Sequence, residues 1–152
     1  MGKRAEAPAL EAIAAVRAAA RYLHLMQDRW ADAHGLSEGR MQLLFMLKRF
    51  GDGGGISLGH LADLQGVTPR TITGLVDNLE KAGLVERVAE PSDRRSILAR
   101  LTPAGKARIE SLRQPTWKLT SPLTAGFSGE ELIQLRHLSL KLLANAQEME
   151  KS

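Results

Sequence analysis

The polar side chains most able to do chemistry in this sequence lie in the segment 68–82. Apolar residues recur there at helical spacing, at Ile72, Leu75, Val76 and Leu79. If these point inward, the outward face carries Arg70, Thr71, Thr73, Gly74, Asp77 and Asn78. Arginine pairs with guanine, asparagine pairs with adenine, and threonine contacts a thymine methyl group or a phosphate. Since no acidic residue occurs from Thr68 to Val76, the first half of this helix suits contact with a polyanion.

A second group of candidate residues lies in the loop AEPSDRRS, about ten residues further along the chain. Arg94 and Arg95 stand next to each other at the tip of this loop. Arginine side chains in such a position can reach the phosphate backbone of a nucleic acid. We expect the neighbouring Asp93 to organise the loop, by pairing with an arginine or by capping the turn.

Two short helices are expected to position the first group. The first runs from Leu58 to Gln65 and ends at Gly66, because glycine adopts the left-handed conformation at no steric cost. Thr68 is a good N-cap for the second helix, and Pro69 suits its first position, where the missing N–H is not needed. This order predicts a helix-turn-helix, whose second helix can enter a DNA major groove.

Two strand-like runs are expected to hold the arginine-tipped loop. Gly83 ends the second helix, and the two runs contain Leu84, Val85 and Val88, then Ile97, Leu98 and Leu101. Arg87 and Arg100 point outward from these strands, and either can reach phosphate, with Arg87 the stronger candidate. The loop from Pro91 to Ser96 would form a wing beside the helix-turn-helix.

These residues also match a known family. The run LADLQGVTPRTITGLVDNLEKAGLVER, followed by PSDRRSILARLTPAG, resembles the winged helix-turn-helix of the multiple-antibiotic-resistance regulator (MarR) family. The most specific part is Asp93-Arg94-Arg95, followed by Leu101-Thr102 and Gly105. The resemblance covers about a third of the chain closely. It implies a dimeric, effector-responsive transcription regulator, usually a repressor, whose wing arginine reaches the minor groove.

The resemblance also implies a fold that is mainly α with a small β-wing. A single domain, 1–152, would contain a DNA-binding lobe at 36–102 and dimerisation helices at 8–35 and 103–150. The predicted partner is double-stranded DNA with a pseudo-palindromic operator, and the predicted DNA-binding residues are Thr68, Pro69, Arg70, Thr71, Thr73, Gly74, Asn78, Arg87, Asp93, Arg94 and Arg95. Small aromatic or lipophilic acids are the usual inducers in this family, but no effector-binding residue is identified by the sequence.

The flanking segments read as long helices with one apolar face. Residues 1–7 are expected to form a loose tail, followed by helices over Ala9–Ala33 and Glu38–Phe50. Another helix begins after Thr102 and either bends near Gln114 or ends there and resumes, because Pro115 and Pro122 interrupt it. Ser128 and Glu131 form a capping box for the last helix, which runs to about Glu148. Since apolar faces of this length need cover, we predict a homodimer whose two recognition helices lie about 34 Å apart.

The composition permits a polyanionic partner without establishing one. The chain has a formal charge of +4 and a sequence pI near 9.8. The segment 56–102, however, contains six Lys or Arg and six Asp or Glu, so the proposed DNA-binding unit has no net charge. The prediction of DNA binding therefore rests on where the charges lie, not on their total.

Several other classes of function lack support in the sequence. There are no cysteines, the four histidines form no metal-spaced set, and no motif of a catalytic centre or phosphate loop occurs. We predict no cofactor and no enzyme activity. No apolar run reaches the roughly 20 residues that span a bilayer, so we predict a cytoplasmic protein without a membrane partner.

Two alternatives stay open at this level. The winged module could serve as a protein–protein adaptor without specific DNA binding, since a fold does not fix a function. An adaptor would not need both the acid-free helix face and the arginine-tipped wing. In addition, large apolar side chains could line an effector pocket, although a place in the core is favoured for them: Met26, Trp30, Met41, Met46, Trp117 and the phenylalanines.

Overall fold

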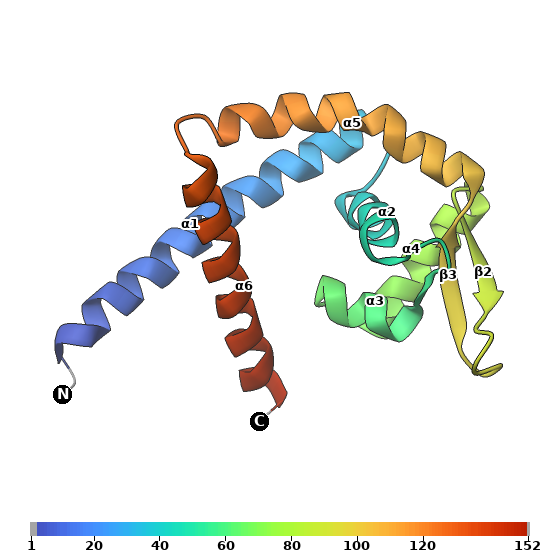
Figure 1. The fold of residues 1–152 in the computed structure, drawn as a ribbon, viewed down its shortest axis with the longest axis horizontal. Coiled ribbons are helices and arrows are strands. Elements are labelled where there is room, and N and C mark those ends of the chain that lie inside the picture. Colours follow the sequence, from blue (N-terminus) through green and yellow to red (C-terminus); the bar gives the residue numbers. More distant parts are fainter. Residues whose placement is uncertain (1–2, 152) are drawn as a thin grey trace. The chain divides into compact units, whose positions relative to one another are not determined.

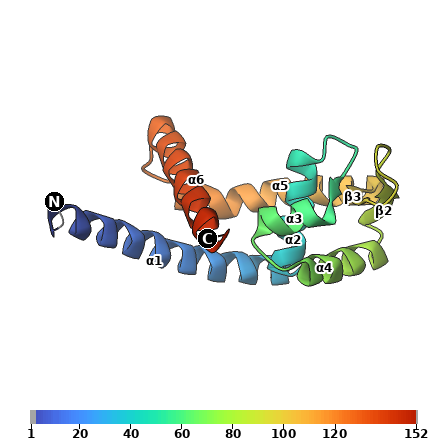
Figure 2. The ribbon, with the colours of Figure 1, turned by 90° about the horizontal axis from the view of Figure 1, so that it is seen from below.

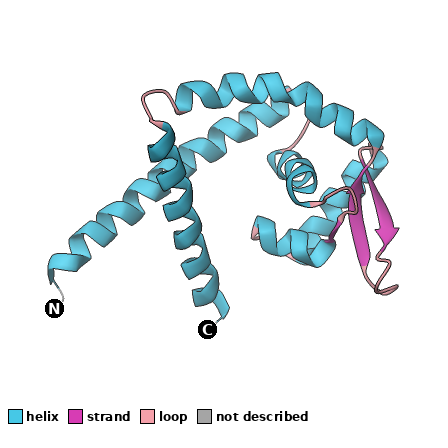
Figure 3. Cartoon of the chain, in the orientation of Figure 1, coloured by secondary structure: helices cyan, strands magenta, loops and turns pink. Residues whose placement is uncertain are grey.

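The computed structural model describes residues 3–151, with side chains from residue 6 onward (Figure 1). The elements follow in the order α1 (Lys3–Ala33), α2 (Glu38–Phe50), β1 (Ile56–Ser57), α3 (Leu58–Gln65), α4 (Pro69–Lys81), β2 (Val85–Ala89), β3 (Ile97–Leu101), α5 (Pro103–Leu123) and α6 (Gly129–Lys151). The predicted class, mainly α with a small β-wing, is confirmed (Figure 3).

The chain divides into two compact units, one up to Ile109 and one from Glu110. The first unit holds α1 to α4, the three strands and the start of α5. The second unit holds the rest of α5 and all of α6.

A small apolar core holds the first unit together. α2 packs against α3, α4 and β3, and α4 packs against β2. Figures 1 and 2 show α2, α3 and α4 gathered in one lobe, with the β2–β3 hairpin beside them. The side chains that are almost fully buried in this lobe are Leu43, Leu44, Leu61, Ile72, Val76, Leu79 and Val85. Burial of a side chain of this kind stabilises the fold by about 1.5–3 kcal/mol.

The sheet has three antiparallel strands in the order β1-β3-β2. β2 and β3 pair over five residues, from Val85 opposite Leu101 to Ala89 opposite Ile97. β1 adds Ile56 opposite Ala99 and Ser57 opposite Leu98. The pairing of this short strand with the wing was not predicted. This pairing joins the beginning of the helix-turn-helix to the hairpin.

Capping interactions explain why these helices begin and end where they do. Ser37, Ser57 and Thr68 each accept the backbone N–H three residues further along, at 3.2–3.3 Å. Gly66 ends α3 in the left-handed conformation, with φ 64°. Pro69 occupies the first turn of α4, as predicted. These caps fix the turn between α3 and α4.

The join between the lobe and α5 leaves no room for a side chain at Gly105. The Thr102 hydroxyl donates to the Gly83 carbonyl oxygen at 2.6 Å and accepts the Gly105 N–H at 3.0 Å. A Cβ on Gly105 would lie 2.0 Å from the Leu84 carbonyl oxygen. The backbone of α5 thus approaches the α4–β2 turn as closely as only a glycine permits.

Helix α1 begins earlier than predicted. The backbone is helical from Lys3, so a loose tail is wrong for residues 3–7, whereas residues 1–2 lie outside the described part. Pro8 lies inside the helix and removes one hydrogen bond near its N-terminal end. The strong helix propensity of the alanine-rich segment that follows offsets this loss.

Helix α5 is continuous from Pro103 to Leu123, with Pro115 and Pro122 inside it. The alternative in which the helix ends near Gln114 and resumes is therefore wrong. Thr116 donates its hydroxyl to the Leu112 carbonyl oxygen at 2.6 Å, one residue after the first proline. α6 begins with the predicted capping box, in which Ser128 and Glu131 exchange bonds of 2.8 and 3.1 Å. Among the described residues, no helix is long and apolar enough to cross a membrane.

Candidate DNA-binding surface

The outward face of α4 has the predicted composition. Ile72, Val76 and Leu79 are buried and Leu75 is half-buried. The residues predicted to point outward are all exposed: Thr68, Pro69, Arg70, Thr71, Thr73, Gly74, Asp77 and Asn78. Their contact with DNA stays a prediction, but every one of them is accessible to a partner.

The hydroxyls on this face are bonded within the helix and the arginine is not. Thr68 and Thr71 share a hydrogen bond of 2.9 Å between their hydroxyls, and the Thr73 hydroxyl donates to the Pro69 carbonyl oxygen at 3.0 Å. Asn78 donates its amide to the Gly74 carbonyl oxygen at 2.8 Å. Of the side chains that the structure describes, none forms an ion pair or hydrogen bond with the Arg70 guanidinium. Arg70 is therefore the cation of this face that is available to a ligand.

The first turn of α4 contains no acidic residue. Free backbone N–H groups at a helix N-terminus carry a partial positive charge and attract phosphate. Thr68 uses one of these N–H groups, that of Thr71, for its cap. The start of α4 is thus electrostatically compatible with a phosphate backbone.

The wing loop is a hydrogen-bonded turn that Asp93 organises. Its carboxylate accepts the backbone N–H of Arg95 at 2.9 Å, and its carbonyl oxygen accepts the N–H of Ser96 at 2.9 Å. Glu90 closes the loop by donating its N–H to the Ser96 carbonyl oxygen at 3.0 Å. The prediction that Asp93 caps the turn is confirmed.

The two arginines at the tip of the wing are exposed. Within the part of the chain whose side chains are described, neither the Arg94 nor the Arg95 guanidinium has an acidic partner. Because the turn is fixed by the Asp93 cap, both side chains project from a defined backbone. They can meet a phosphate or a groove without first breaking an ion pair.

Arg87, at the base of the wing, is engaged by α4. Its guanidinium bonds Asp77 Oδ1 at 2.6 Å and also pairs with the Glu80 carboxylate. Its backbone N–H donates to the other oxygen of Glu80 at 3.3 Å. The hydrogen bond that Arg87 donates to Asp77, together with Glu80, raises the pKa of Arg87 above its already high ordinary value, so this residue stays protonated throughout the accessible pH range.

Arg100 also has an acidic partner. Its Nε and one terminal nitrogen bond the same Glu86 oxygen at 2.9 and 2.7 Å. The two residues lie opposite each other in the β2–β3 register. Sequence reasoning placed Arg87 and Arg100 outward but missed both sets of partners. The pairing of Glu86 with Arg100 could have been found from the cross-strand register, whereas that of Arg87 depends on how β2 lies across α4.

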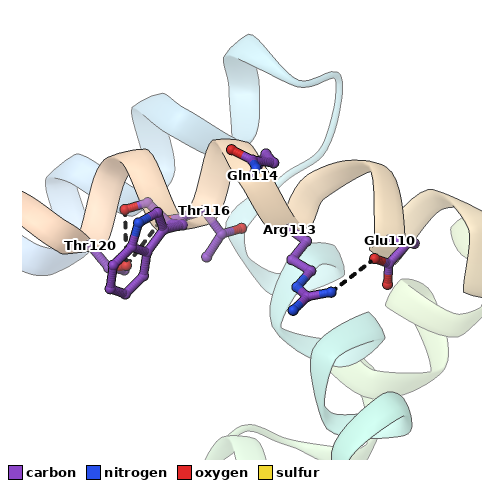
Figure 4. A pocket seen from close by; sticks show the side chains of 6 residues that line it. Glu110, Arg113, Gln114, Thr116 and Thr120 are labelled. Atoms are coloured by element: carbon purple, nitrogen blue, oxygen red, sulfur yellow. Dashed lines mark hydrogen bonds and ion pairs between the residues drawn. The ribbon is translucent and has the colours of Figure 1, made fainter.

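A pocket of about 650 Å³ lies along α5 in the second unit. Its lining residues are Glu110, Arg113, Gln114, Thr116, Trp117 and Thr120 (Figure 4). Arg113 pairs with Glu110 at 3.4 Å, and the Trp117 ring is 64% exposed. The expectation that Trp117 is a core residue is therefore wrong, whereas Met41 is buried in the core as favoured. Glu110 and Arg113, about two turns and one turn before Trp117, were the available signal for this pocket.

No group of three or more His, Asp or Glu residues among the described side chains is placed to hold a metal ion. The polar residues described above converge on no reacting centre. What the lobe offers is an exposed, partly cationic set of side chains on the first half of α4 and at the tip of the wing.

Comparison with known proteins gives consistent matches. A model described as MarR family matches residues 34–96. The chain is 32% identical to the transcriptional activatory protein BadR of Rhodopseudomonas palustris over 132 residues, which cover 86% of this chain and 75% of BadR. It is 37% identical to the HTH-type transcriptional repressor YetL of Bacillus subtilis over 108 residues, 71% of this chain but only 64% of YetL. The crystal structure of a probable transcriptional regulator from Pseudomonas aeruginosa matches with a TM-score of 0.68 and 28% identity, covering 84% of this chain and 92% of that chain.

A helix-turn-helix followed by a two-stranded wing, with an exposed recognition helix, defines a DNA-binding transcription regulator of the winged helix-turn-helix class. The extent of the match to BadR, together with the family model, assigns the chain within that class. It belongs to the MarR family.

Proposed function

We propose that the chain is a homodimeric repressor that binds a pseudo-palindromic operator and is released by a small-molecule effector. In this proposal α4 enters the major groove, where Arg70, Thr71 and Thr73 read bases or phosphates. The wing places Arg94 and Arg95 on the backbone or in the minor groove. A cytoplasmic location follows, because in bacteria such as those of its relatives the operator DNA lies in the cytoplasm.

One observation carries the DNA-binding part of the proposal. The exposed, acid-free half of α4 and the unpaired arginines of the wing tip belong to the same lobe. Arginine presented without a competing carboxylate is the usual source of both phosphate contacts and guanine recognition. An adaptor surface has no need for this combination.

Exposed apolar side chains support the dimer. On α1, Leu10, Ile13 and Val16 are between 42% and 71% exposed. On α6, five large aliphatic side chains are between 49% and 60% exposed: Ile133, Leu135, Leu138, Leu140 and Leu143. Apolar faces of this size in water mark surfaces that a partner covers. A second copy of the chain would cover both, and light scattering that gives a monomer mass at micromolar concentration would contradict this part.

The α5 pocket is the place we propose for the effector. Trp117 offers an aromatic face, and Arg113 can pair with a carboxylate if it leaves Glu110. Small aromatic or lipophilic acids combine these two features. A panel of such acids should quench the fluorescence of Trp117, and the quenching should be lost in Trp117→Phe while Trp30 still reports on the fold.

The experiment that tests DNA binding is fluorescence anisotropy on the upstream intergenic DNA of the gene, with a scrambled duplex as competitor. We expect saturable binding to the upstream DNA that exceeds binding to the scramble by about a thousandfold. Equal, salt-sensitive binding to both duplexes would contradict a specific operator. Since YetL is a repressor by name and BadR is an activatory protein, a reporter assay with and without the protein decides the direction of regulation.

A further inference from the structure

Arg87 uses both terminal nitrogens of its guanidinium for bonds within the protein. One terminal nitrogen contacts Asp77 Oδ1 at 2.6 Å and the other contacts the Glu80 carboxylate. The planar guanidinium can bridge two carboxylates in this way, whereas a lysine ammonium is a point charge. Only 24% of the Arg87 side chain is exposed, compared with 50% for Asp77 and 42% for Glu80. The cation is thus covered more than the two anions that it joins.

The two acids occupy a sensitive place on α4. Asp77 and Glu80 lie three residues apart, so they share one face of the helix. Asp77 follows Thr73 by four residues, which puts it one helical turn from the predicted base-reading face. This separation is well within a Debye length of about 8–10 Å, so an uncompensated carboxylate there would repel a bound phosphate backbone.

We propose that Arg87 is a positioning residue for DNA binding: it neutralises the Asp77 and Glu80 carboxylates on the recognition helix and holds them back from the DNA. This inference rests on the proposed DNA-binding function and assigns Arg87 a role other than the phosphate contact predicted from the sequence. With Arg87 in place, the three side chains have a net charge of −1. Without it, the same part of α4 has a charge of −2.

Direct phosphate contact by Arg87 would carry an electrostatic penalty. A guanidinium that moved away from α4 to reach DNA would leave two charge-assisted hydrogen bonds, which are about twice as strong as neutral ones. The same movement would leave both carboxylates facing the polyanion. Arg94 and Arg95 face neither cost, because no acid pairs with them in the described part of the chain.

The test compares variants that keep the local charge constant. Arg87→Gln should weaken operator binding about tenfold or more, since it leaves two unpaired carboxylates. The double variants Arg87→Gln/Asp77→Asn and Arg87→Gln/Glu80→Gln restore the net charge of −1 without a guanidinium. If neutralisation is the role of Arg87, both doubles should bind within about threefold of the wild type. For both doubles, the slope of log K against log salt concentration, where K is the association constant for the operator, should equal the wild-type slope. The protein still neutralises the same phosphates in these variants.

A direct phosphate contact gives the opposite result and would overturn the inference. The doubles would then stay as weak as Arg87→Gln, with a salt slope smaller by about 0.9. A purely structural role would also leave the doubles weak, and thermal unfolding would show them destabilised to the same extent as the single variant. If the wild-type chain binds no operator at all, the proposed function falls together with this role of Arg87, whereas weak doubles beside a tight wild type refute the role of Arg87 alone.

Two further variants complete the experiment. Arg100→Gln removes one positive charge and breaks the Glu86 pair on the neighbouring strand, so it matches Arg87→Gln in net charge. It should cost less than about threefold in affinity, because Glu86 does not lie on α4. An equal loss in both variants would contradict a site-specific effect.

A second variant keeps the test usable if Arg87→Gln fails to fold. Asp77→Asn/Glu80→Gln, which retains Arg87, should bind the operator about threefold or more tightly than the wild type. Unchanged or weaker binding would overturn the inference.

Discussion

The β2–β3 hairpin and its loop carry four arginines, and the two near the base differ from the two at the tip. Arg87 and Arg100 are both paired with carboxylates, whereas Arg94 and Arg95 have no acidic partner within the described residues. The base therefore contributes little net charge, and the tip contributes two free cations. This difference explains how a segment without net charge, 56–102, can still present a cationic surface. Three of the six acids in this segment, Asp77, Glu80 and Glu86, form ion pairs at the base of the wing.

The largest expected effect concerns Gly105, where α5 contacts the turn that leads into β2. In Gly105→Ala the new Cβ would meet the Leu84 carbonyl oxygen, so the backbone of the α4–β2 turn has to shift. We expect a loss of about 2–3 kcal/mol in the free energy of unfolding, as for an overpacked core. Urea denaturation followed by circular dichroism measures it. In the matched control Gly74→Ala nothing lies within 4 Å of the new Cβ, and a gain of about 0.5–1 kcal/mol is expected from helix propensity.

Removing the two arginines at the tip of the wing, Arg94 and Arg95, should have the next largest effect. Arg94→Ala/Arg95→Ala should weaken binding to operator and scrambled DNA alike, by about tenfold to a hundredfold at physiological salt. The slope of log K against log salt should fall by about 0.9 for each phosphate that the variant no longer neutralises. Anisotropy titrations at several salt concentrations measure both quantities. An unchanged affinity in the double variant would remove the tip from the DNA-binding surface and, with it, the contrast between tip and base.

Arg70, on α4, should determine which operator sequence is preferred instead of how tightly all DNA is bound. Arg70→Ala is expected to relax the preference at one operator base pair by about 1–3 kcal/mol, the value of a bidentate contact. Competition with operators substituted at single positions gives this value. A uniform loss over all operators would mean that Arg70 contacts phosphate, as the wing does.

The smallest effect is expected from the Glu86–Arg100 ion pair at the base of the wing. Glu86→Gln/Arg100→Gln removes an exposed cross-strand ion pair, and such pairs contribute less than about 1 kcal/mol. Thermal unfolding should therefore change little. A large loss of stability here would show that the base depends on ion pairs instead of on the apolar residues beneath it.

The lobe itself was predictable because its signals are local. Thr68 with Pro69, and the glycines at 66 and 83, fix the helix ends through capping and left-handed backbone, and the structure follows them. The accessible face of α4 follows from the spacing of three buried side chains. The residues that we predict to contact DNA are exposed, apart from Arg87, but their contacts remain to be measured.

Contacts between residues distant in sequence were not predictable in this way. The partners of Arg87 depend on how β2 lies across α4, which no local spacing encodes. The sequence signals also failed at prolines. The alanine-rich helix was expected to begin only after Pro8, and a bend or an end was expected near Pro115, yet each proline lies inside a helix. The exposure of Trp117 could not be predicted, because it depends on what surrounds α5 instead of on the residue itself.

Ser57 links two elements, β1 and α3, and this link should couple their opening. Its backbone is the last residue of β1, paired with Leu98 of the wing, and its hydroxyl caps α3. The amides of α3, β1 and β3 should therefore exchange with deuterium in one cooperative step instead of in order along the chain. The wing and α3 should then open as one unit, through the residue that they share.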